Sequence, residues 1–237
     1  LPHSARFTAR SSNNTDRGER NTIMKILFQG DSVTDAGRDR SNPHDMGEGY
    51  AKFASAMIED AFPDVSFEFC NLGISGNRTC DLVERLENDF VEIQPDIVSV
   101  LIGINDVWHY YLFGKEVTDR EFEANYRKVL DALRQRTNAK ILLIDPFLIA
   151  EPDQPQMRAH LDRFIGIVHR LAAEYADAHL PLQEIMNREI APEDRAEYAA
   201  DGIHPTQEGA CLIGERYLEA VTPLIRALIP DDGCADT

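Results

Sequence analysis

Apolar residues are spaced along the chain in two ways that alternate, one typical of strands and one typical of helices. Short apolar or alternating runs, which are typical of strands, occupy 24–29, 65–71, 96–103 and 139–146. Between these runs, apolar residues recur every three or four positions, as they do on one face of a helix. A weak fifth strand is expected near 178–182.

The stretches with helical spacing also carry helix-end signals. Pro63 ends the first of them, and Thr118 with Glu121 forms a capping box before the third. The apolar stripes that predict helices run over 50–62, 82–90, 122–133, 157–172 and 212–228. Strands that alternate with helices predict an α/β fold, here a three-layer α/β/α sandwich around a parallel sheet of about five strands.

One domain accounts for most of the 237 residues, and we place it at 24–230. Residues 1–23 hold four arginines and many Ser, Asn and Thr, without an apolar period or the apolar stretch of a secretory signal. We expect Met24 to be the natural start, 1–23 to be a disordered leader or an expression remnant, and 231–237 to be a flexible tail.

The amino-acid composition limits which molecules the protein is expected to bind. A formal net charge of −17 repels a phosphate backbone, so we expect no nucleic acid and favour a neutral ester or glycan as substrate. No apolar run approaches the roughly 18 residues that span a bilayer, so we expect no membrane-crossing segment. The four cysteines form no CxxC pair and have no histidine at metal spacing; they are Cys70, Cys80, Cys211 and Cys234. We expect free, buried thiols in a reducing cytoplasm, and no metal site.

Four short segments carry the residue types of an acyl-transfer site. The first strand ends abruptly at Gly30-Asp31-Ser32, which leaves the serine at the carboxyl end of a strand, where sites gather in open α/β sheets. The others are 71–77, with two closely spaced glycines, then 103–106 and 201–205. Taken singly, each can be an ordinary turn or helix cap, and only the combination indicates chemistry.

A serine hydroxyl becomes a nucleophile when a base takes its proton. Asp201 lies three residues before His204, so its carboxylate can hold one imidazole nitrogen while the other accepts the serine proton. Asn105 can offer an amide donor without adding a charge, which suits an oxyanion hole. The chain therefore predicts a serine hydrolase whose triad is Ser32, Asp201 and His204.

Ser, Gly, Asn and His segments in this order, with Asp three residues before the His, resemble the SGNH branch of the GDSL hydrolases from about Met24 to about Pro230. Within that branch, 35–38, 73–77 and 102–108 are most similar to the bacterial acetylxylan-esterase-like enzymes, which remove acetyl groups from sugar chains. The resemblance implies flavodoxin-like layering, no metal or organic cofactor, and homo-oligomers.

The expected reaction is hydrolysis of acetyl esters, on xylo-oligosaccharides or related glycans, through an acyl-enzyme. The backbone N–H groups of Ser32 and Gly73 and the side chain of Asn105 would hold the oxyanion. Substrate contacts are expected from Asp31, Arg38 and Trp108.

The aromatic run at 107–113, which includes Trp108 and Tyr111, can line a substrate pocket, pack under a loop or contact a partner subunit. His160 and His169 are interpreted as surface or packing histidines, because they lie on or beside an apolar helical stripe.

Other functions fit less well. A lysophospholipase or thioesterase of the same family needs a long apolar groove, which the sequence neither shows nor excludes. A non-catalytic carbohydrate-binding module on this fold is expected to lack one of the four segments, and all four are intact. A Rossmann-type or flavodoxin-type cofactor binder needs G-x-G-x-x-G after the first strand, and an α/β-hydrolase needs a G-x-S-x-G elbow; both motifs are absent.

Overall fold

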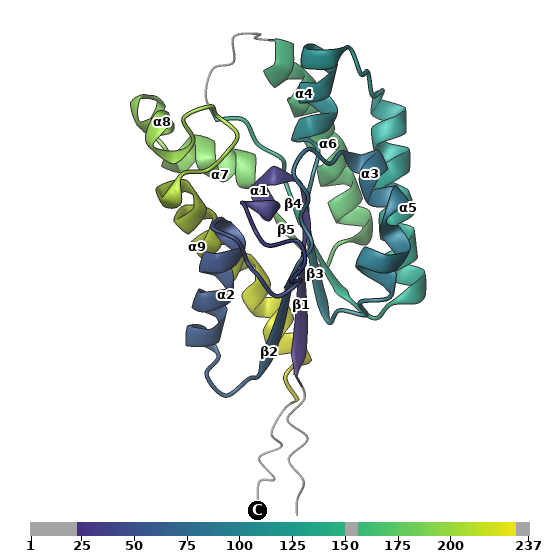
Figure 1. Cartoon of the computed structure of the whole chain (residues 1–237), viewed down its shortest axis with the longest axis vertical. Coiled ribbons are helices and arrows are strands. Elements are labelled where there is room, and N and C mark those ends of the chain that lie inside the picture. The colour runs from purple at the N-terminus through teal and green to yellow at the C-terminus, as the bar shows by residue number, and fades with distance from the viewer. Residues whose placement is uncertain (1–22, 150–155, 231–237) are drawn as a thin grey trace, which may run out of the picture.

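The computed structural model describes residues 23–149 and 156–230; the expected leader, except Ile23, and the expected tail lie outside the described residues. Parallel strands form one sheet in the order β2-β1-β3-β4-β5 (Figure 1). The strands are β1 (Met24–Gly30), β2 (Phe67–Asn71), β3 (Ile97–Leu101), β4 (Lys140–Ile144) and β5 (Ala178–Leu180). This is the flavodoxin-like strand order, so the expected fold is confirmed.

Helices cover both faces of the sheet and complete the three layers (Figure 1). On one face α2 (Tyr50–Ala61) packs against α9 (Gln207–Leu228). The other face is covered by α3 (Thr79–Glu84), α5 (Asp119–Arg136) and α6 (Gln156–Tyr175). The remaining helices are α1 (Ser32–Asp35), α4 (Ile104–Phe113), α7 (Leu182–Glu189) and α8 (Arg195–Tyr198), with a π-helical turn at Glu87–Val91 and a 3₁₀ turn at Pro192–Asp194.

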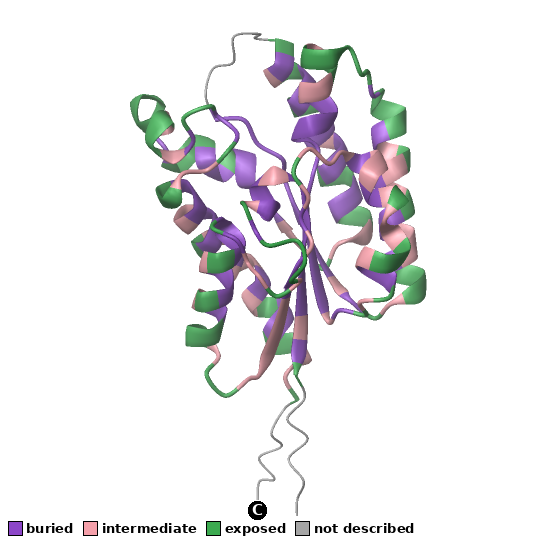
Figure 2. Ribbon diagram, in the orientation of Figure 1, coloured by how far each residue is buried: buried purple, intermediate pink, exposed green. Residues whose placement is uncertain are grey.

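The core lies between the sheet and its helical layers (Figure 2). Every residue of β3 is buried, and so is all of β1 except Lys25. These two central strands run in register, with Gly30 opposite Leu101, so their carboxyl ends lie side by side at one edge of the sheet. Residues that follow β1 and β3 are therefore held close together by the most buried part of the fold.

Some segments take a different form from the expected one. The aromatic run at 107–113 belongs to α4, and α7 follows β5 where no helix was expected. The second strand begins at Phe67, two residues later than expected. None of these differences changes the expected order of strands and helices.

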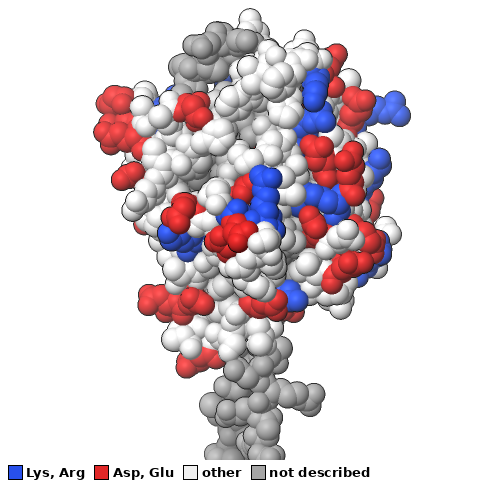
Figure 3. Space-filling view, in the orientation of Figure 1, with Lys and Arg blue, Asp and Glu red and all other residues white. Residues whose placement is uncertain are grey.

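Acidic side chains are spread over the visible face of the molecule, with Lys and Arg among them (Figure 3). Several ion pairs bridge neighbouring elements, such as Arg136 with Glu87 at 2.7 Å. Exposed pairs of this kind contribute only about 0–1 kcal/mol each, so burial in the core carries most of the stability. Across 23–149 and 156–230, no helix is both long enough and apolar enough to cross a membrane.

Candidate active site

Ser32 and His204 are 172 residues apart in the chain, yet their side chains meet. The Oγ atom of Ser32 lies 2.9 Å from Nε2 of His204. Ser32 is the first residue of α1, two residues after the end of β1, and His204 lies in the loop before α9. The structure thus joins the expected nucleophile to the expected base.

Asp201 completes the hydrogen-bond chain. Its Oδ2 atom lies 2.6 Å from Nδ1 of His204, and its Oδ1 atom accepts the backbone N–H groups of His204 at 2.8 Å and Ile203 at 2.9 Å. Partial burial by itself raises the pKa of Asp201, but the hydrogen bonds from His204 and Ile203 lower that pKa below its ordinary value. The ionised carboxylate can hold a proton on Nδ1 and leave Nε2 to accept the serine proton.

Contacts from other elements fix the loop that carries Asp201 and His204. The N–H of Ile149, which follows β4, donates to the carbonyl of Gly202 at 2.9 Å. Thr206 caps α9 with its side chain and donates its own N–H to the carbonyl of Tyr198 at 2.8 Å. The loop is therefore tied at both ends, which keeps the imidazole aimed at Ser32.

Asn105 follows β3 and lies in the first turn of α4. Its Nδ2 atom donates one hydrogen to the carbonyl of Asn77 at 3.0 Å, which leaves the second amide hydrogen for another acceptor. The sharp turn into α4 needs Gly103, whose φ is +135°. The expected third segment is thus placed beside the second.

Asp106, the residue after Asn105, holds the start of α4 in place. Its carboxylate accepts the hydroxyl of Thr79 at 2.6 Å and the N–H of Thr79 at 3.0 Å, which ties α4 to α3. Burial raises the pKa of Asp106 to about 7, although the hydrogen bonds from Thr79 lower it. The sequence indicated no role for this pair, because only the folded chain brings these two residues, 27 positions apart, within hydrogen-bond distance.

Gly73 does not supply a free oxyanion donor, contrary to the expectation. Its N–H donates to Oδ1 of Asn71 at 3.0 Å. A Cβ added at Gly73 would lie 2.5 Å from the backbone nitrogen of Asp35, so the residue is a glycine because the chain passes close to α1.

Gly76 offers the donor that Gly73 does not. Its φ is +84°, and its N–H donates to no acceptor in the described part of the chain. It immediately precedes Asn77, whose carbonyl binds the amide of Asn105. The N–H of Ser32 is likewise the first of α1 and has no helical acceptor.

Two of the three expected substrate contacts are also corrected. Asp31 is fully buried and caps α1 by accepting the N–H of Val33 at 3.1 Å. Arg38 is buried as well, and its Nε atom donates to the carbonyl of Gly73 at 3.0 Å, so it supports the second segment from inside. Trp108, in contrast, is half-buried, and its ring centroid lies 5.9 Å from that of His204.

Two further residues hold the segments together and were not singled out from the sequence. The side chain of Asn71 donates to the carbonyls of Thr34 at 2.7 Å and Met46 at 3.2 Å. Oδ2 of Asp35 accepts the N–H of Ser75 at 2.8 Å and pairs with Arg40. Both side chains are buried, and Asn71 is a polar residue at the end of a predicted strand, which is the signal that points to such a role.

Two groups of potential metal ligands lie outside the triad. Among the described residues, the groups of three His, Cys, Asp or Glu side chains close enough to share an ion are His44–Glu68–Cys70 and Asp145–His169–His179. Neither contains a residue of the triad.

Comparison with known proteins identifies the family of this chain. Residues 28–211 match the model of the GDSL-like lipase/acylhydrolase family. The chain is 32% identical over 205 residues to an acetylxylan esterase of Geobacillus stearothermophilus, covering 83% of this chain and 93% of that enzyme.

Solved structures of similar fold point to the same family. The crystal structure of Axe2, an acetylxylan esterase from the same bacterium, matches with a TM-score of 0.74 at 31% identity, over 83% of this chain and 93% of that one. A putative GDSL-like lipase from Parabacteroides merdae matches with a TM-score of 0.80 at 30% identity, over 85% of this chain and 96% of that one. Since the family match spans most of the domain and includes the serine, this chain belongs to the GDSL-like lipase/acylhydrolase family and is a carboxylic ester hydrolase.

Proposed function

We propose that this enzyme removes acetyl groups from xylo-oligosaccharides or related glycans through an acyl-enzyme. The hydrogen-bond chain from Ser32 through His204 to Asp201 is the observation that carries the reaction. The identity of 32% to an acetylxylan esterase over 205 residues supports the substrate class.

The reaction has two halves. Ser32 Oγ attacks the acetyl carbon as Nε2 of His204 takes its proton, and the imidazolium then protonates the sugar oxygen as its bond to the acetyl carbon breaks, which releases the sugar hydroxyl. Water next attacks the acetyl-serine, with His204 again acting as base, and acetate leaves as the proton returns to Ser32. Asp201 keeps the imidazole in the tautomer with hydrogen on Nδ1 throughout, and it stabilises the transient imidazolium.

Three donors are available for the oxyanion. These are the N–H of Ser32, the N–H of Gly76 and the second amide hydrogen of Asn105. Because Asn105 is already held by Asn77 and neighbours Asp106, it needs no reorganisation when negative charge develops on the carbonyl oxygen. We assign Gly76 this role in place of Gly73.

Trp108 is the residue best placed to contact the sugar. Its ring lies beside the imidazole of His204 and is only partly buried. An indole face stacks on the apolar face of a sugar ring, which would orient a glycan so that its ester meets Ser32.

The test is hydrolysis of p-nitrophenyl acetate, butyrate, octanoate and palmitate, followed by acetate release from acetylated xylo-oligosaccharides. We expect activity to fall steeply beyond acetate, acetate to be freed from the sugar, and Ser32→Ala to lower kcat by about 10⁴ to 10⁶. A preference for octanoate or longer would replace this proposal with a lysophospholipase or thioesterase function. Activity that survives Ser32→Ala would refute the mechanism.

Two further proposals concern the whole protein. We propose a homo-oligomer, because Leu112 and Phe113 at the end of α4 are 56% and 64% exposed and gain by burial against another subunit. Light scattering on wild type and Phe113→Ser tests this, and a monomeric wild type would contradict it.

We propose the cytoplasm as its compartment, since Cys70, Cys80 and Cys211 are unpaired thiols, of which only Cys70 is buried as expected. Cell fractionation tests that location, and recovery outside the cytoplasm would contradict it.

A further inference from the structure

A second cluster of reactive side chains lies on the α6 side of the sheet. Asp145 directly follows β4, His179 lies on β5, and His169 lies on α6. His179 pairs in register with Leu143, two residues before Asp145, so both side chains project from the same face of the sheet. That is the face that α6 covers (Figure 1).

The three side chains converge on one point. Nε2 of His179 lies 2.8 Å from Oδ1 of Asp145, and Nε2 of His169 lies 3.0 Å from Oδ2. All three ligand atoms lie within 4.8 Å of one another. Two ligand atoms that share an ion at about 2.0–2.1 Å are themselves about 3–3.5 Å apart, so a small outward shift makes room for an ion.

Burial and charge favour a cation at this point. The Asp145 side chain is 1% exposed, and its partners in the described part of the chain are these two imidazoles, with no Lys or Arg. A buried carboxylate is costly unless a positive charge or several hydrogen bonds compensate it. The imidazoles are 44% and 25% exposed, because β5 is the edge strand, so an ion can enter from solvent and keep water ligands.

We propose that Asp145, His169 and His179 bind a divalent transition-metal ion, with zinc as the best match to two imidazoles and one carboxylate. In the ion-free form both imidazoles carry hydrogen on Nε2 and donate to Asp145. On binding, each neutral imidazole carries its hydrogen on Nδ1 instead and gives the Nε2 lone pair to the ion. The ion then links α6 to the edge of the sheet, and none of its ligands hydrogen-bonds to Ser32, Asp201 or His204.

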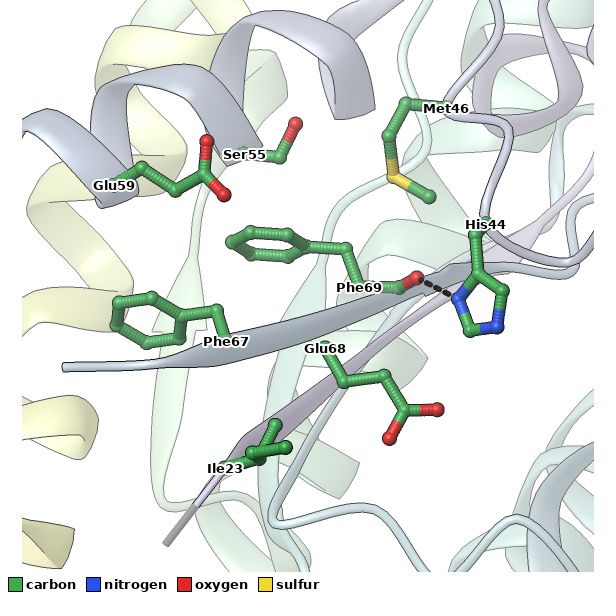
Figure 4. Close-up of a pocket in the computed structure, with 8 residues that line it drawn as sticks. All are labelled: Ile23, His44, Met46, Ser55, Glu59, Phe67, Glu68 and Phe69. Carbon is green, nitrogen blue, oxygen red and sulfur yellow. Dashed lines mark hydrogen bonds between the residues drawn. The ribbon is translucent and has the colours of Figure 1, made fainter. Parts of the chain in front are cut away.

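The other candidate group is a poorer ligand set and therefore a useful control. Nδ1 of His44 lies 2.9 Å from the carbonyl of Phe69, which occupies that nitrogen (Figure 4). Sγ of Cys70 lies 4.0 Å from both His44 and Glu68. This group borders the hollow between α2 and β2 that Phe67 and Glu59 line.

The test is titration of the chelator-treated full chain with ZnCl₂ by isothermal titration calorimetry. We expect one equivalent to bind, and we expect His169→Gln and His179→Gln each to weaken binding by about 100-fold or more, since loss of even an outer-shell partner costs 10–100-fold. His169 is half-exposed, so its glutamine variant should stay folded, which its p-nitrophenyl acetate activity reports.

Two matched variants and a second metal complete the design. His44→Gln and His204→Gln each remove one imidazole elsewhere and should bind zinc as wild type does, and MgCl₂ should give no heat because magnesium prefers oxygen ligands. Zinc should also raise the Tm of wild type but not of His169→Gln. Absence of zinc binding in the micromolar range, wild-type affinity in both His169→Gln and His179→Gln, or loss of binding in His44→Gln would each overturn the proposal.

Discussion

The carboxyl group beside the nucleophile gives the sharpest quantitative prediction. Asp31 is fully buried, its Oδ1 accepts the N–H of Val33, and its Oδ2 has no hydrogen-bond partner among the described residues. Burial raises its pKa from 3.8 to about 7; the Val33 N–H lowers it in part, and the nearby Asp106 raises it further. Since a tenfold change in proton affinity corresponds to about 1.4 kcal/mol, ionising Asp31 in the folded protein costs about 4 kcal/mol.

Proton linkage gives the direction in which the stability of the fold changes with pH. A carboxyl that binds its proton more tightly in the folded state contributes its full stability below the unfolded pKa of 3.8, and that contribution is lost as pH rises towards 7. Between pH 4.5 and pH 8, wild type should therefore lose about 3 kcal/mol through this group alone. Asp31→Asn cannot ionise, and it keeps an acceptor for the Val33 N–H, so it should escape this loss.

The assay is urea unfolding of wild type and Asp31→Asn at pH 4.5, 6 and 8. An amide placed where Oδ2 has no partner adds a cost that is the same at every pH, so the change of the difference with pH carries the information. We expect the variant to gain about 3 kcal/mol relative to wild type from pH 4.5 to pH 8. Asp39→Asn is the control, because that exposed carboxylate has a lowered pKa and should give a flat difference. If the difference in unfolding free energy between Asp31→Asn and wild type did not change with pH, the raised pKa of Asp31 would be refuted.

Four other substitutions test the site. Asn105→Ala should lower kcat by about 10² to 10³ with little change in Tm, because it removes one oxyanion donor; an unchanged kcat would exclude that role. Asp201→Asn should lower kcat by about 10⁴, since the amide would favour the imidazole tautomer that cannot accept the serine proton; residual activity within tenfold of wild type would contradict it. Gly73→Ala should destabilise the fold by about 1–3 kcal/mol in urea unfolding, because its Cβ would meet the Asp35 backbone; a stable variant with impaired kcat would return the oxyanion role to Gly73. Trp108→Ala should raise KM for acetylated xylo-oligosaccharides about tenfold and leave p-nitrophenyl acetate nearly unchanged; equal effects on both substrates would argue against sugar stacking.

The architecture was largely predictable from the sequence, because it depends on patterns that repeat along the chain. Apolar runs of strand length and stripes of helical period gave the order of elements, including the weak strand that became β5 (Ala178–Leu180). The triad was predictable for a related reason. Ser32 follows the end of a buried strand, and Asp201 lies three residues from His204, so residue type and local spacing already restrict what these groups can do.

The predictions for individual site residues were wrong where a role depends on which polar group is left without a hydrogen-bond partner. Two glycines of the second segment were candidates for the same donor, and only the folded chain shows that Asn71 occupies the N–H of Gly73. Arg38 was expected to contact the substrate, yet it is buried and donates to the carbonyl of Gly73. The contact between Asn71 and Gly73 is local, but several local partners are open to such an N–H and only the folded chain shows which one it takes. The contact of Arg38 with Gly73 spans 35 residues, and a contact of that length leaves no mark in residue spacing.

Residue types and their spacing are enough to predict which residues can perform ester chemistry and in which layers they lie, because periodicity and strand ends are local properties. The tertiary structure decided which polar groups are buried, paired or free, because packing brings distant residues within hydrogen-bond distance. His169 shows the difference most clearly. On its helix it is one histidine beside an apolar stripe, and only the packing of α6 on β4 and β5 sets it against Asp145 and His179.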